Sequence, residues 1–487
     1  MTHTPAAEAG STLQVESRSY EFVPLEERHG KTRNLFSLWF GEQLSSFALV
    51  TGALAVSLGL NFWWAIAAIV LGNLIGATMM AGHSAQGPAL GLPQMIQSRA
   101  QFGFYGTLLP LVITWVMYVA FSAVAVVIAG QGFQSVFGGS LALWIAVSVV
   151  PILVLAIVGY DMIHSSIKYI GWVMGVLFIV VAVLLFRHGV SMDQLGHGGF
   201  SWSSFLGATS LFVTWQLTYA PYVSDYSRYL PPHETKGAFW YTYVGTVGGS
   251  VVVMVLGAAV ATLAPTADVV QTVRNLGGGT GGGIIVVMLA IGLIIVNSTN
   301  IYGGTISTLT LLQHFKDIRS TVPKRVAAAL LIGGLAVLAG IAGSADFVDN
   351  LINYLNFVLY FMIPWTTVNL VDFYVIHHGS YRTEDFFSKN GTFGRWGMPA
   401  IATYLITFVI EVPFINTTVF EGPLARAMGG VDLAWLVGPV VSIPLYLVLA
   451  KRKLRIRHLS MPSAAELLDG EPAEGLRTGG KEAESSR

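Results

Sequence analysis

Cysteine is absent from the 487 residues of this chain, and charged residues make up only 11% of it. Without cysteine the chain has no disulfide framework, no thiolate nucleophile and no cysteine-ligated zinc or iron–sulfur centre. Soluble domains carry about 25% charged residues, so the low charge content argues against a cytosolic globular enzyme. The chain is therefore expected to lie in an apolar environment.

An excess of charge of one sign is also missing. Lys and Arg together number 26, as do Asp and Glu, so the formal net charge is zero and no basic field attracts nucleic acid. The first 34 residues contain no apolar core before a small-residue cleavage site, so we expect no cleaved signal peptide. Zinc-protease motifs and nucleophile elbows are not apparent either, so we expect no enzyme, no cofactor and no metal site.

What the chain has in abundance is apolar sequence: 54% of its residues are hydrophobic and the mean hydropathy is +0.65. About 20 apolar residues span a bilayer as a helix. The long uncharged blocks predict an all-α polytopic membrane protein with twelve transmembrane helices. The predicted spans are residues 35–58, 62–82, 107–129, 141–159, 168–186, 204–222, 238–263, 283–312, 325–343, 350–375, 398–416 and 431–450.

The distribution of basic residues predicts the orientation. Twelve spans place both tails on one side, and of the 26 Lys and Arg residues all but Arg187, Arg274 and Arg426 fall on that side. The positive-inside rule then predicts cytoplasmic N- and C-termini in the cell (inner) membrane. The expected parts are an N-tail over 1–34, a ten-helix core over 35–376, a solvated loop with helices 11 and 12 over 377–450, and a C-tail over 451–487.

A carboxylate interrupts the first span. Glu42 lies about eight residues into it, which is roughly 12 Å deep for a helix, and it is followed by Gln43, Ser45 and Ser46. A carboxylate at that depth must be paired, hydrated or protonated. Two roles are open: Glu42 exchanges a coupling proton, or it lies in a cytoplasmic vestibule and bonds to a helix end.

Proline interrupts the sixth span. Pro221 removes a backbone donor and disfavours helical geometry at Ala220, so the helix is expected to break there. Breaks in spans one and six, five helices apart, indicate an inverted-repeat transporter with its binding site at the membrane midplane. Asp225 and Arg228 follow the break at i, i+3, and we expect a structural ion pair or gate from them rather than a substrate contact.

Spans three and eight contain the remaining candidate residues. Tyr118 and Phe121 lie at i, i+3, on one face of helix 3. Packing is the ordinary role of such aromatics. Asn297 begins a polar patch in span eight, for which interhelical hydrogen bonding is the ordinary role. An amide also offers a donor and an acceptor together, which matches the edge of a heterocyclic base.

Four segments stand in a characteristic order along spans one to ten. They are Leu38–Ser46, Gly87–Gly103, Asp225–Pro231 and Asn300–Tyr302. In sequence and spacing they resemble the nucleobase–cation symporter family, which includes cytosine and purine–cytosine permeases and hydantoin or allantoin transporters. The resemblance implies twelve helices, of which ten form two inverted five-helix repeats with helices 1 and 6 broken.

The resemblance also implies a binding site. Family members hold a planar heterocycle between an aromatic residue of helix 3 and one of helix 6, and polar groups read its edge. Phe121 stands where the helix-3 tryptophan usually stands, and Tyr219 matches the helix-6 aromatic. Asn297 matches a helix-8 amide, and Ser45 or Ser46 matches the polar position of helix 1.

This sequence departs from the family pattern at several site positions. Tyr118 falls where some cytosine carriers have glutamine, and Ala125 falls where fungal relatives have asparagine. Gln216, one turn from Tyr219, is the substitute amide that we expect to bind substrate, while Trp215 either stacks on the substrate or packs. These departures leave the identity of the transported base open.

The coupling ion is suggested by a missing hydroxyl group. Sodium-coupled members of the family place Ser or Thr hydroxyls about one turn before the helix-8 amide, whereas this chain has Gly292–Val296 there, without a hydroxyl. Since sodium prefers oxygen ligands, Glu42 is the expected carrier of a coupling proton.

The resulting expectation is a secondary active symporter that imports a nucleobase (cytosine or purine), or a related planar heterocycle, with a proton. One alternative is a sodium-coupled hydantoin, allantoin or other small-metabolite carrier of the same fold. Outside transport, the alternatives are a receptor that binds without transporting and a membrane enzyme.

Overall fold

The computed structural model describes residues 21–264, 268–316 and 321–459, and it is almost entirely helical, with no β-strand within these ranges. The predictions made for the N-tail before residue 21 and for the C-tail beyond residue 459 lie outside the described residues. The α-helices are α1 (Arg33–Gln43), α2 (Ser46–Ser57), α3 (Phe62–Leu90), α4 (Gln94–Gln97), α5 (Arg99–Phe102), α6 (Leu108–Phe137), α7 (Leu141–Val158), α8 (Tyr160–His188), α9 (Met192–Gly196), α10 (Trp202–Leu217), α11 (Val223–Ser227), α12 (Thr235–Ala261), α13 (Val269–Gly277), α14 (Gly279–Phe315), α15 (Val322–Gly343), α16 (Phe347–Val371), α17 (Met398–Glu411), α18 (Pro423–Ala427) and α19 (Ala434–Leu459).

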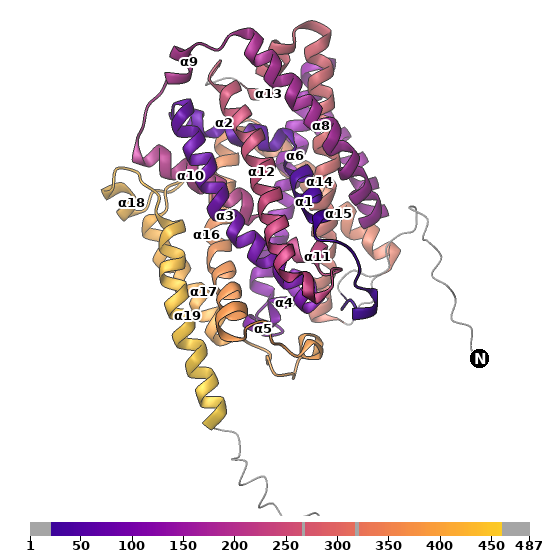
Figure 1. The fold of residues 1–487 in the computed structure, drawn as a ribbon, viewed down its shortest axis with the longest axis vertical. Coiled ribbons are helices and arrows are strands. Elements are labelled where there is room, and N and C mark those ends of the chain that lie inside the picture. Colours follow the sequence, from indigo (N-terminus) through magenta and orange to yellow (C-terminus); the bar gives the residue numbers. More distant parts are fainter. Residues whose placement is uncertain (1–20, 265–267, 317–320, 460–487) are drawn as a thin grey trace, which may run out of the picture.

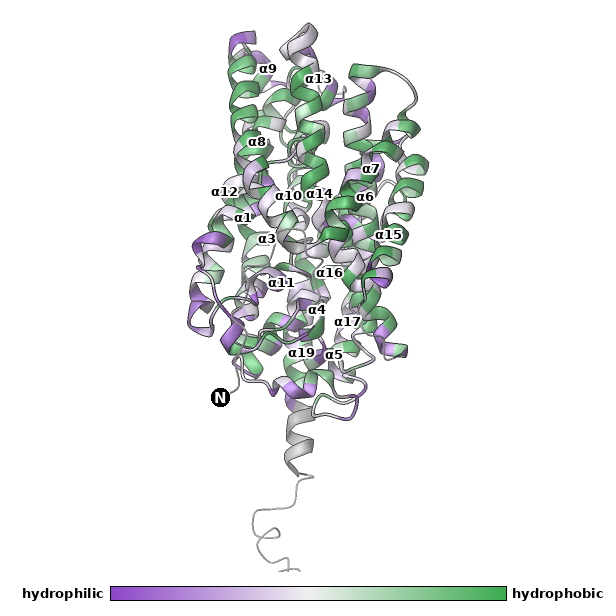
Figure 2. Ribbon diagram, turned by 90° about the vertical axis from the view of Figure 1, so that its right-hand side faces the viewer, coloured by the Kyte–Doolittle hydropathy of each residue, from purple (hydrophilic) through white to green (hydrophobic). Residues whose placement is uncertain are grey.

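The long helices run side by side as one bundle (Figure 1). Nine helices within the described ranges are long and apolar enough to cross a membrane. Figure 2 shows apolar residues along the outer helices α7, α8 and α15, where side chains such as Leu143, Trp172 and Leu338 are exposed. Exposed apolar side chains along the length of a bundle fit contact with lipid. The all-α membrane architecture is therefore confirmed.

The first, sixth and eleventh predicted spans fall on shorter helices, which explains why nine long helices stand against twelve predicted spans. The first span is divided into α1 and α2, the sixth ends early in α10, and the eleventh is the short apolar helix α17 with its continuation to Phe414. The twelve-span topology and its division into two inverted repeats stay predictions.

Both expected helix breaks are present. α1 ends at Gln43, and Ser45 adopts an extended conformation and caps α2 by accepting a hydrogen bond from the backbone N–H of Ala48 at 3.3 Å. α10 ends at Leu217, and α11 begins only at Val223. The five-residue turn between them contains Pro221, which lacks the N–H that a continuous helix requires.

Glycine allows α2 and α12 to cross closely. A Cβ atom on Gly52 would lie 2.1 Å from the carbonyl oxygen of Met254, and one on Gly257 would lie 1.9 Å from that of Leu49. Small residues at such crossings let two backbones approach, which is how membrane helices gain packing contacts. These contacts hold α2 firmly against α12 beside the first break.

The loop that joins α16 to α17 is not solvated throughout, in contrast to the expectation. Phe386 is completely buried in a cluster with Leu92, Ile96 and Phe373. The guanidinium of Arg99 donates to the carbonyl oxygen of Phe386 at 2.9 Å. Apolar residues within the loop therefore dock it onto the segment of α4 and α5, at the end of the bundle where those two short helices lie (Figure 1).

The start of the described chain lies at this same end of the bundle. The backbone N–H of Val23 donates to the carbonyl oxygen of Gly91 at 3.0 Å. The guanidinium of Arg28 donates to the carbonyl oxygens of Pro88 at 2.9 Å and Leu90 at 3.4 Å. These carbonyls end α3, so Arg28 satisfies helix-terminal acceptors that have no intrahelical donor.

Candidate functional site

A small cavity lies where the two helix breaks meet α6 and α14. Its volume is about 10 Å³, which is room for about one water molecule. Six of the residues predicted to bind the substrate or the coupling proton line it: Glu42, Ser45, Phe121, Trp215, Tyr219 and Asn297. Six others complete the lining: Phe47, Ala125, Tyr222, Leu293, Val296 and Asn300.

Glu42 reaches this cavity from the last turn of α1. Its side chain is only 2% exposed, and its Oε1 accepts a hydrogen bond from the hydroxyl of Thr299 on α14 at 3.1 Å. The second carboxylate oxygen, Oε2, has no hydrogen-bond partner among the described residues. A buried carboxylate oxygen without a donor is costly, so this atom is available for a proton or for a donor on a bound molecule.

Aromatic rings form the walls of the cavity. The rings of Trp215 and Tyr219 meet edge to face, with centroids 6.0 Å apart and planes at 71°. Phe121, on α6, lies 5.3 Å from the ring of Phe47. The indole N–H of Trp215 donates to Oε1 of Gln43 at 2.5 Å, which fixes the orientation of the ring. Such faces suit a flat apolar ring system.

Asn297 supplies an amide at the same cavity. Its Oδ1 accepts a hydrogen bond from the side-chain amide of Asn300 at 3.0 Å, whereas its Nδ2 has no partner among the described residues. A buried N–H₂ donor and a buried carboxylate oxygen are therefore both unsatisfied beside the aromatic walls. Buried polar groups are normally hydrogen-bonded, so the pair is suited to a polar ligand.

Three predicted site residues do not line the cavity. Ser46 donates to the carbonyl oxygen of Leu289 at 3.4 Å, and Tyr118 packs over Gly303, where a Cβ atom would lie 2.6 Å from its ring. Gln216 faces away, towards α3 and α12, and its amide donates to Asn73 at 2.7 Å.

The remaining donor and acceptor capacity of the Gln216 amide also has partners. It donates to Ser250 at 3.0 Å and accepts from Thr246 at 2.6 Å. Its hydrogen-bonding capacity is taken up by neighbouring helices, so in this structure Gln216 joins α10 to α3 and α12 and does not present an amide to the cavity.

Several residues that line the cavity were not predicted from the sequence, because the sequence patterns around them are weak. Asn300 ends the polar run that Asn297 begins, and the i, i+3 spacing puts both on one face of α14. Tyr222 follows Pro221 directly, and its ring lies 5.8 Å from that of Tyr219. The sequence does not distinguish Phe47, because an apolar residue directly after two polar residues is typical of an ordinary helix core.

Asp225 and Arg228 lie on and just after α11 and bind different segments. Oδ1 of Asp225 accepts from the backbone N–H of Gln94 at 2.8 Å. The guanidinium of Arg228 donates to the carbonyl oxygen of Glu21 at 3.2 Å and to the hydroxyl of Tyr229 at 3.0 Å. α11 is therefore tied to α4 on one side and to the start of the described chain on the other, and neither side chain lines the cavity.

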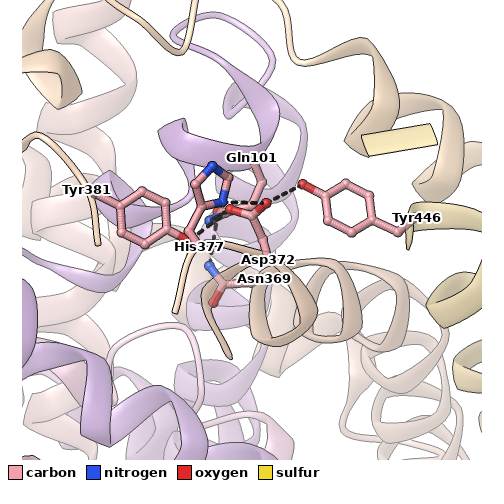
Figure 3. A network of polar contacts seen from close by, with 6 residues as sticks. All are labelled: Gln101, Asn369, Asp372, His377, Tyr381 and Tyr446. Carbon is pink, nitrogen blue, oxygen red and sulfur yellow. Dashed lines mark hydrogen bonds and ion pairs between the residues drawn. The ribbon is translucent and has the colours of Figure 1, made fainter. Parts of the chain in front are cut away.

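A second polar site lies near the end of α16 (Figure 3). Asp372 accepts hydrogen bonds from the side chains of Gln101 at 2.9 Å, Tyr381 at 2.8 Å and Tyr446 at 2.8 Å. His377 lies 3.2 Å from the same carboxylate. A surface cavity of about 250 Å³ opens beside these groups. Asp372 thereby joins α5, the loop after α16 and α19.

The histidine of this second site has a perturbed protonation equilibrium. The carboxylate of Asp372, 3.2 Å from Nδ1 of His377, raises the pKa of His377 above its ordinary value through this close polar contact and its negative charge, while burial opposes both. The charged imidazolium is thus favoured by a fixed partner, which makes this contact sensitive to pH near neutrality.

Comparison with known proteins shows the same architecture elsewhere. The profile of a family described as permeases for cytosine/purines, uracil, thiamine and allantoin matches residues 22–438. YxlA of Bacillus subtilis, provisionally named a purine-cytosine permease, is 40% identical over 91% of this chain and 98% of its own. The purine-cytosine permease fcyB of Emericella nidulans is 25% identical over 92% of this chain and 91% of its own.

Solved structures agree on the fold. Mhp1, a nucleobase-cation-symport-1 family transporter in a closed conformation with bromovinylhydantoin bound, matches with a TM-score of 0.73 at 16% identity, over 92% of this chain and 96% of its own. Mhp1 in its inward-facing conformation matches with a TM-score of 0.71. The chain belongs to the family of permeases for cytosine/purines, uracil, thiamine and allantoin, and it is a multi-pass membrane transporter and not an enzyme.

Proposed function

We propose that this protein imports a nucleobase, or a closely related planar heterocycle, together with a proton. The observation that carries the proposal is the meeting of both helix breaks at one cavity with aromatic walls and two unsatisfied polar atoms, Glu42 Oε2 and Asn297 Nδ2. The names of YxlA and fcyB as purine-cytosine permeases support the same substrate class.

Substrate recognition follows from these groups. The ring would stack against Phe121, Trp215 or Tyr219, and its polar edge would meet the amide of Asn297. Since the cavity now has room for about one water molecule, side chains around it must move apart before a ring can enter. Binding energy that is realised only in the occluded state then drives the change between outward and inward access.

The coupling ion is proposed to be a proton carried by Glu42. A Cβ atom on Gly292 would lie 2.4 Å from the sulfur of Met174, so the thioether of α8 fills the space beside α14 where hydroxyl ligands for sodium would be needed. Thioether sulfur is a poor ligand for a hard cation. Glu42, by contrast, has a free oxygen at the cavity and can carry a proton across without any further ligand.

The orientation belongs to the same proposal. Both termini lie on the cytoplasmic side of the cell membrane, as the distribution of Lys and Arg favours. The end of the bundle that holds Gly91, Asp372 and the start of the described chain is then cytoplasmic, and the loop between α17 and α19 is external.

Uptake of labelled cytosine by cells that express the protein tests the proposal. Adenine, guanine, hypoxanthine, uracil, allantoin and hydantoin serve as competitors, while sodium and external pH are varied. We expect uptake that is competed by nucleobases and driven by external acid without sodium. A correctly inserted protein that neither takes up nor binds any of these compounds would refute the proposed substrate class.

A sodium-coupled carrier of hydantoin or allantoin is the second candidate. It is favoured by the likeness to Mhp1 with a bound hydantoin and by 24% identity to the allantoin permease of Bacillus subtilis over 88% of this chain. Uptake of allantoin that requires sodium and is not competed by cytosine would select this candidate.

A further inference from the structure

A second buried carboxyl group lies away from the cavity, at the end of α17. The side chain of Glu411 is 0% exposed, and neither of its carboxylate oxygens has a hydrogen-bond partner among the described residues. An ionised carboxylate in a membrane interior requires a partner, because its desolvation costs several kcal/mol. The protonation state of Glu411 is therefore expected to differ from that of a glutamate on the surface.

A glycine on α19, Gly438, leaves space for this carboxyl group. A Cβ atom on Gly438 would lie 2.1 Å from Oε1 of Glu411 and 2.4 Å from a methyl carbon of Ile363 on α16. Any residue larger than glycine at position 438 would occupy the place of the carboxyl oxygen. Glu411 is thus held in a recess that three helices form together.

Two further buried polar groups lie next to this recess. Thr407 is one turn before Glu411 on the same face of α17, and Ser442 is one turn after Gly438 on α19. Because α17 and α19 pack against each other, these two residues lie on the helix turns next to Glu411 and Gly438.

Neither hydroxyl is engaged elsewhere. The side-chain oxygens of Thr407 and Ser442 are buried and have no hydrogen-bond partner among the described residues. A buried helical threonine usually donates to the carbonyl four residues earlier, as Thr403 does to Pro399 at 2.8 Å. The oxygens of Thr407 and Ser442 are therefore available as acceptors for an O–H group.

A neighbouring carboxylate, that of Asp432, has the hydrogen-bond donors that Glu411 lacks. Asp432 accepts hydrogen bonds from the hydroxyl of Tyr360 and from the backbone N–H groups of Asn416 at 2.8 Å and Ala434 at 2.9 Å. Three donors stabilise the ionised form. Of two nearby carboxyl groups, one with three donors and one with none, the proton resides on the second.

The other titratable groups at this place carry no positive charge. They are Tyr360 and Tyr404. The hydroxyl of Tyr404 donates to the carbonyl oxygen of Phe361 at 2.9 Å. No Lys, Arg or His side chain within the described ranges forms an ion pair with Glu411. A cationic side chain therefore does not supply the missing partner.

We propose that Glu411 is a second proton-binding site, separate from the substrate cavity. No hydrogen bond joins Glu411 to Thr407 or Ser442 in this structure, and a change of side-chain rotamer lets the carboxylic acid O–H donate to one of these two hydroxyl groups. The proton of Glu411 keeps α16, α17 and α19 packed around an uncharged group. Loss of the proton places a negative charge in the recess beside Asp432 and loosens the packing of α17 against α19. The site does not depend on the identity of the substrate or on Glu42.

Infrared spectroscopy of the purified full-length protein tests the proton directly. In a Glu42→Gln background, we expect a carbonyl band of a protonated carboxylic acid at neutral pH that disappears in Glu42→Gln/Glu411→Gln. The matched control Glu384→Gln, at an exposed loop position, leaves the band unchanged. Thr407→Val or Ser442→Ala shifts the band while Glu411 itself stays, which keeps the test decisive where Glu411→Gln folds poorly.

Absence of the band shows that the carboxylate is ionised and that bound water or a metal cation satisfies it, which overturns the proposal. A second measurement is the midpoint of thermal unfolding against pH. We expect the midpoint of the wild type to fall more steeply with rising pH than that of Glu411→Gln, and equal slopes contradict the proposal. Uptake of cytosine by Glu411→Gln is expected to persist, so a failure of this inference is separable from a failure of the proposed function.

Discussion

Thr299 on α14 donates a hydrogen bond to the carboxylate of Glu42 at the end of α1, across 3.1 Å. The same hydroxyl lies 2.7 Å from the carbonyl oxygen of Val296, one turn earlier on α14. A carboxylate accepts such a bond, whereas a carboxylic acid can donate one to the hydroxyl oxygen. Protonation of Glu42 therefore changes the bond between the broken first span and the helix that carries Asn297, and through this bond the proposed coupling proton would act on the cavity.

Glu42→Gln is expected to weaken the dependence of uptake on external pH, because glutamine keeps the size of the side chain but carries no exchangeable carboxyl proton. Initial rates of cytosine uptake at several external pH values measure this. Thr299→Val, which removes only the donor to Glu42, is the matched control and should keep a pH dependence with an altered midpoint. An unchanged profile in Glu42→Gln would move the coupling site elsewhere.

Asn297→Ala is expected to weaken substrate binding by about 1–3 kcal/mol, roughly fivefold to 150-fold in the Kd, since one buried hydrogen-bonding partner of the ring edge is lost. Binding of labelled cytosine to the purified protein gives the Kd. Asn350→Ala, at an exposed position near the start of α16, should bind as the wild type does. Equal affinity of all three proteins would exclude Asn297 from the site.

Phe121→Ala is expected to cost about 1–3 kcal/mol of binding, the range found when an aromatic residue that stacks on a base is replaced by alanine. Phe121→Trp keeps a ring face at this position and should retain uptake. Tyr118→Phe should have little effect, because Tyr118 packs over Gly303 and does not line the cavity. Loss of uptake in Tyr118→Phe together with normal uptake in Phe121→Ala would reverse the assignment of the two residues.

His377→Gln is expected to remove a pH-dependent part of the stability. The pKa of His377 is raised in the folded protein by its close contact with the carboxylate of Asp372. The stabilisation is therefore fully present below the ordinary histidine pKa of about 6.5 and is lost as the pH rises through the higher folded value. Thermal unfolding midpoints measured from about pH 6 upwards should converge for the wild type and His377→Gln at alkaline pH.

His378→Asn is the control for this measurement, because His378 is the exposed neighbour of His377 in the same loop. Its unfolding midpoint should follow the wild-type pH dependence. Parallel curves for the wild type and His377→Gln over the whole range would show that the contact between His377 and Asp372 contributes no pH-dependent stability.

Sequence rules that act over a few residues predicted the two helix breaks. Pro221 favours a helix break because the missing N–H and the steric restriction on Ala220 belong to the chain itself. Proline alone does not decide the outcome, since Pro88, Pro151 and Pro364 lie inside α3, α7 and α16. A polar run as costly in lipid as Glu42 to Ser46 likewise indicates a functional interruption before any fold is known. Both breaks are found where these rules put them.

Rules of helical spacing could not decide which side chains share a cavity. Tyr118 and Phe121 lie on one face of α6, yet only Phe121 lines the cavity, because Gly303 of α14 lets Tyr118 pack elsewhere. Gln216 is one residue from Trp215, but it faces Asn73 and Ser250 on other helices. The direction in which a polar side chain points depends on which helix packs beside it.

The sequence alone determined that this chain crosses a membrane many times, that its first and sixth spans are broken, and that it resembles a known transporter family. Hydropathy, proline and glycine act within a few residues, so their consequences can be derived without a fold. Only the tertiary structure decided that Glu42 meets Thr299 and that Glu411 lies in the recess at Gly438. Those partners are distant in the chain, so only the packing of one helix against another brings them together.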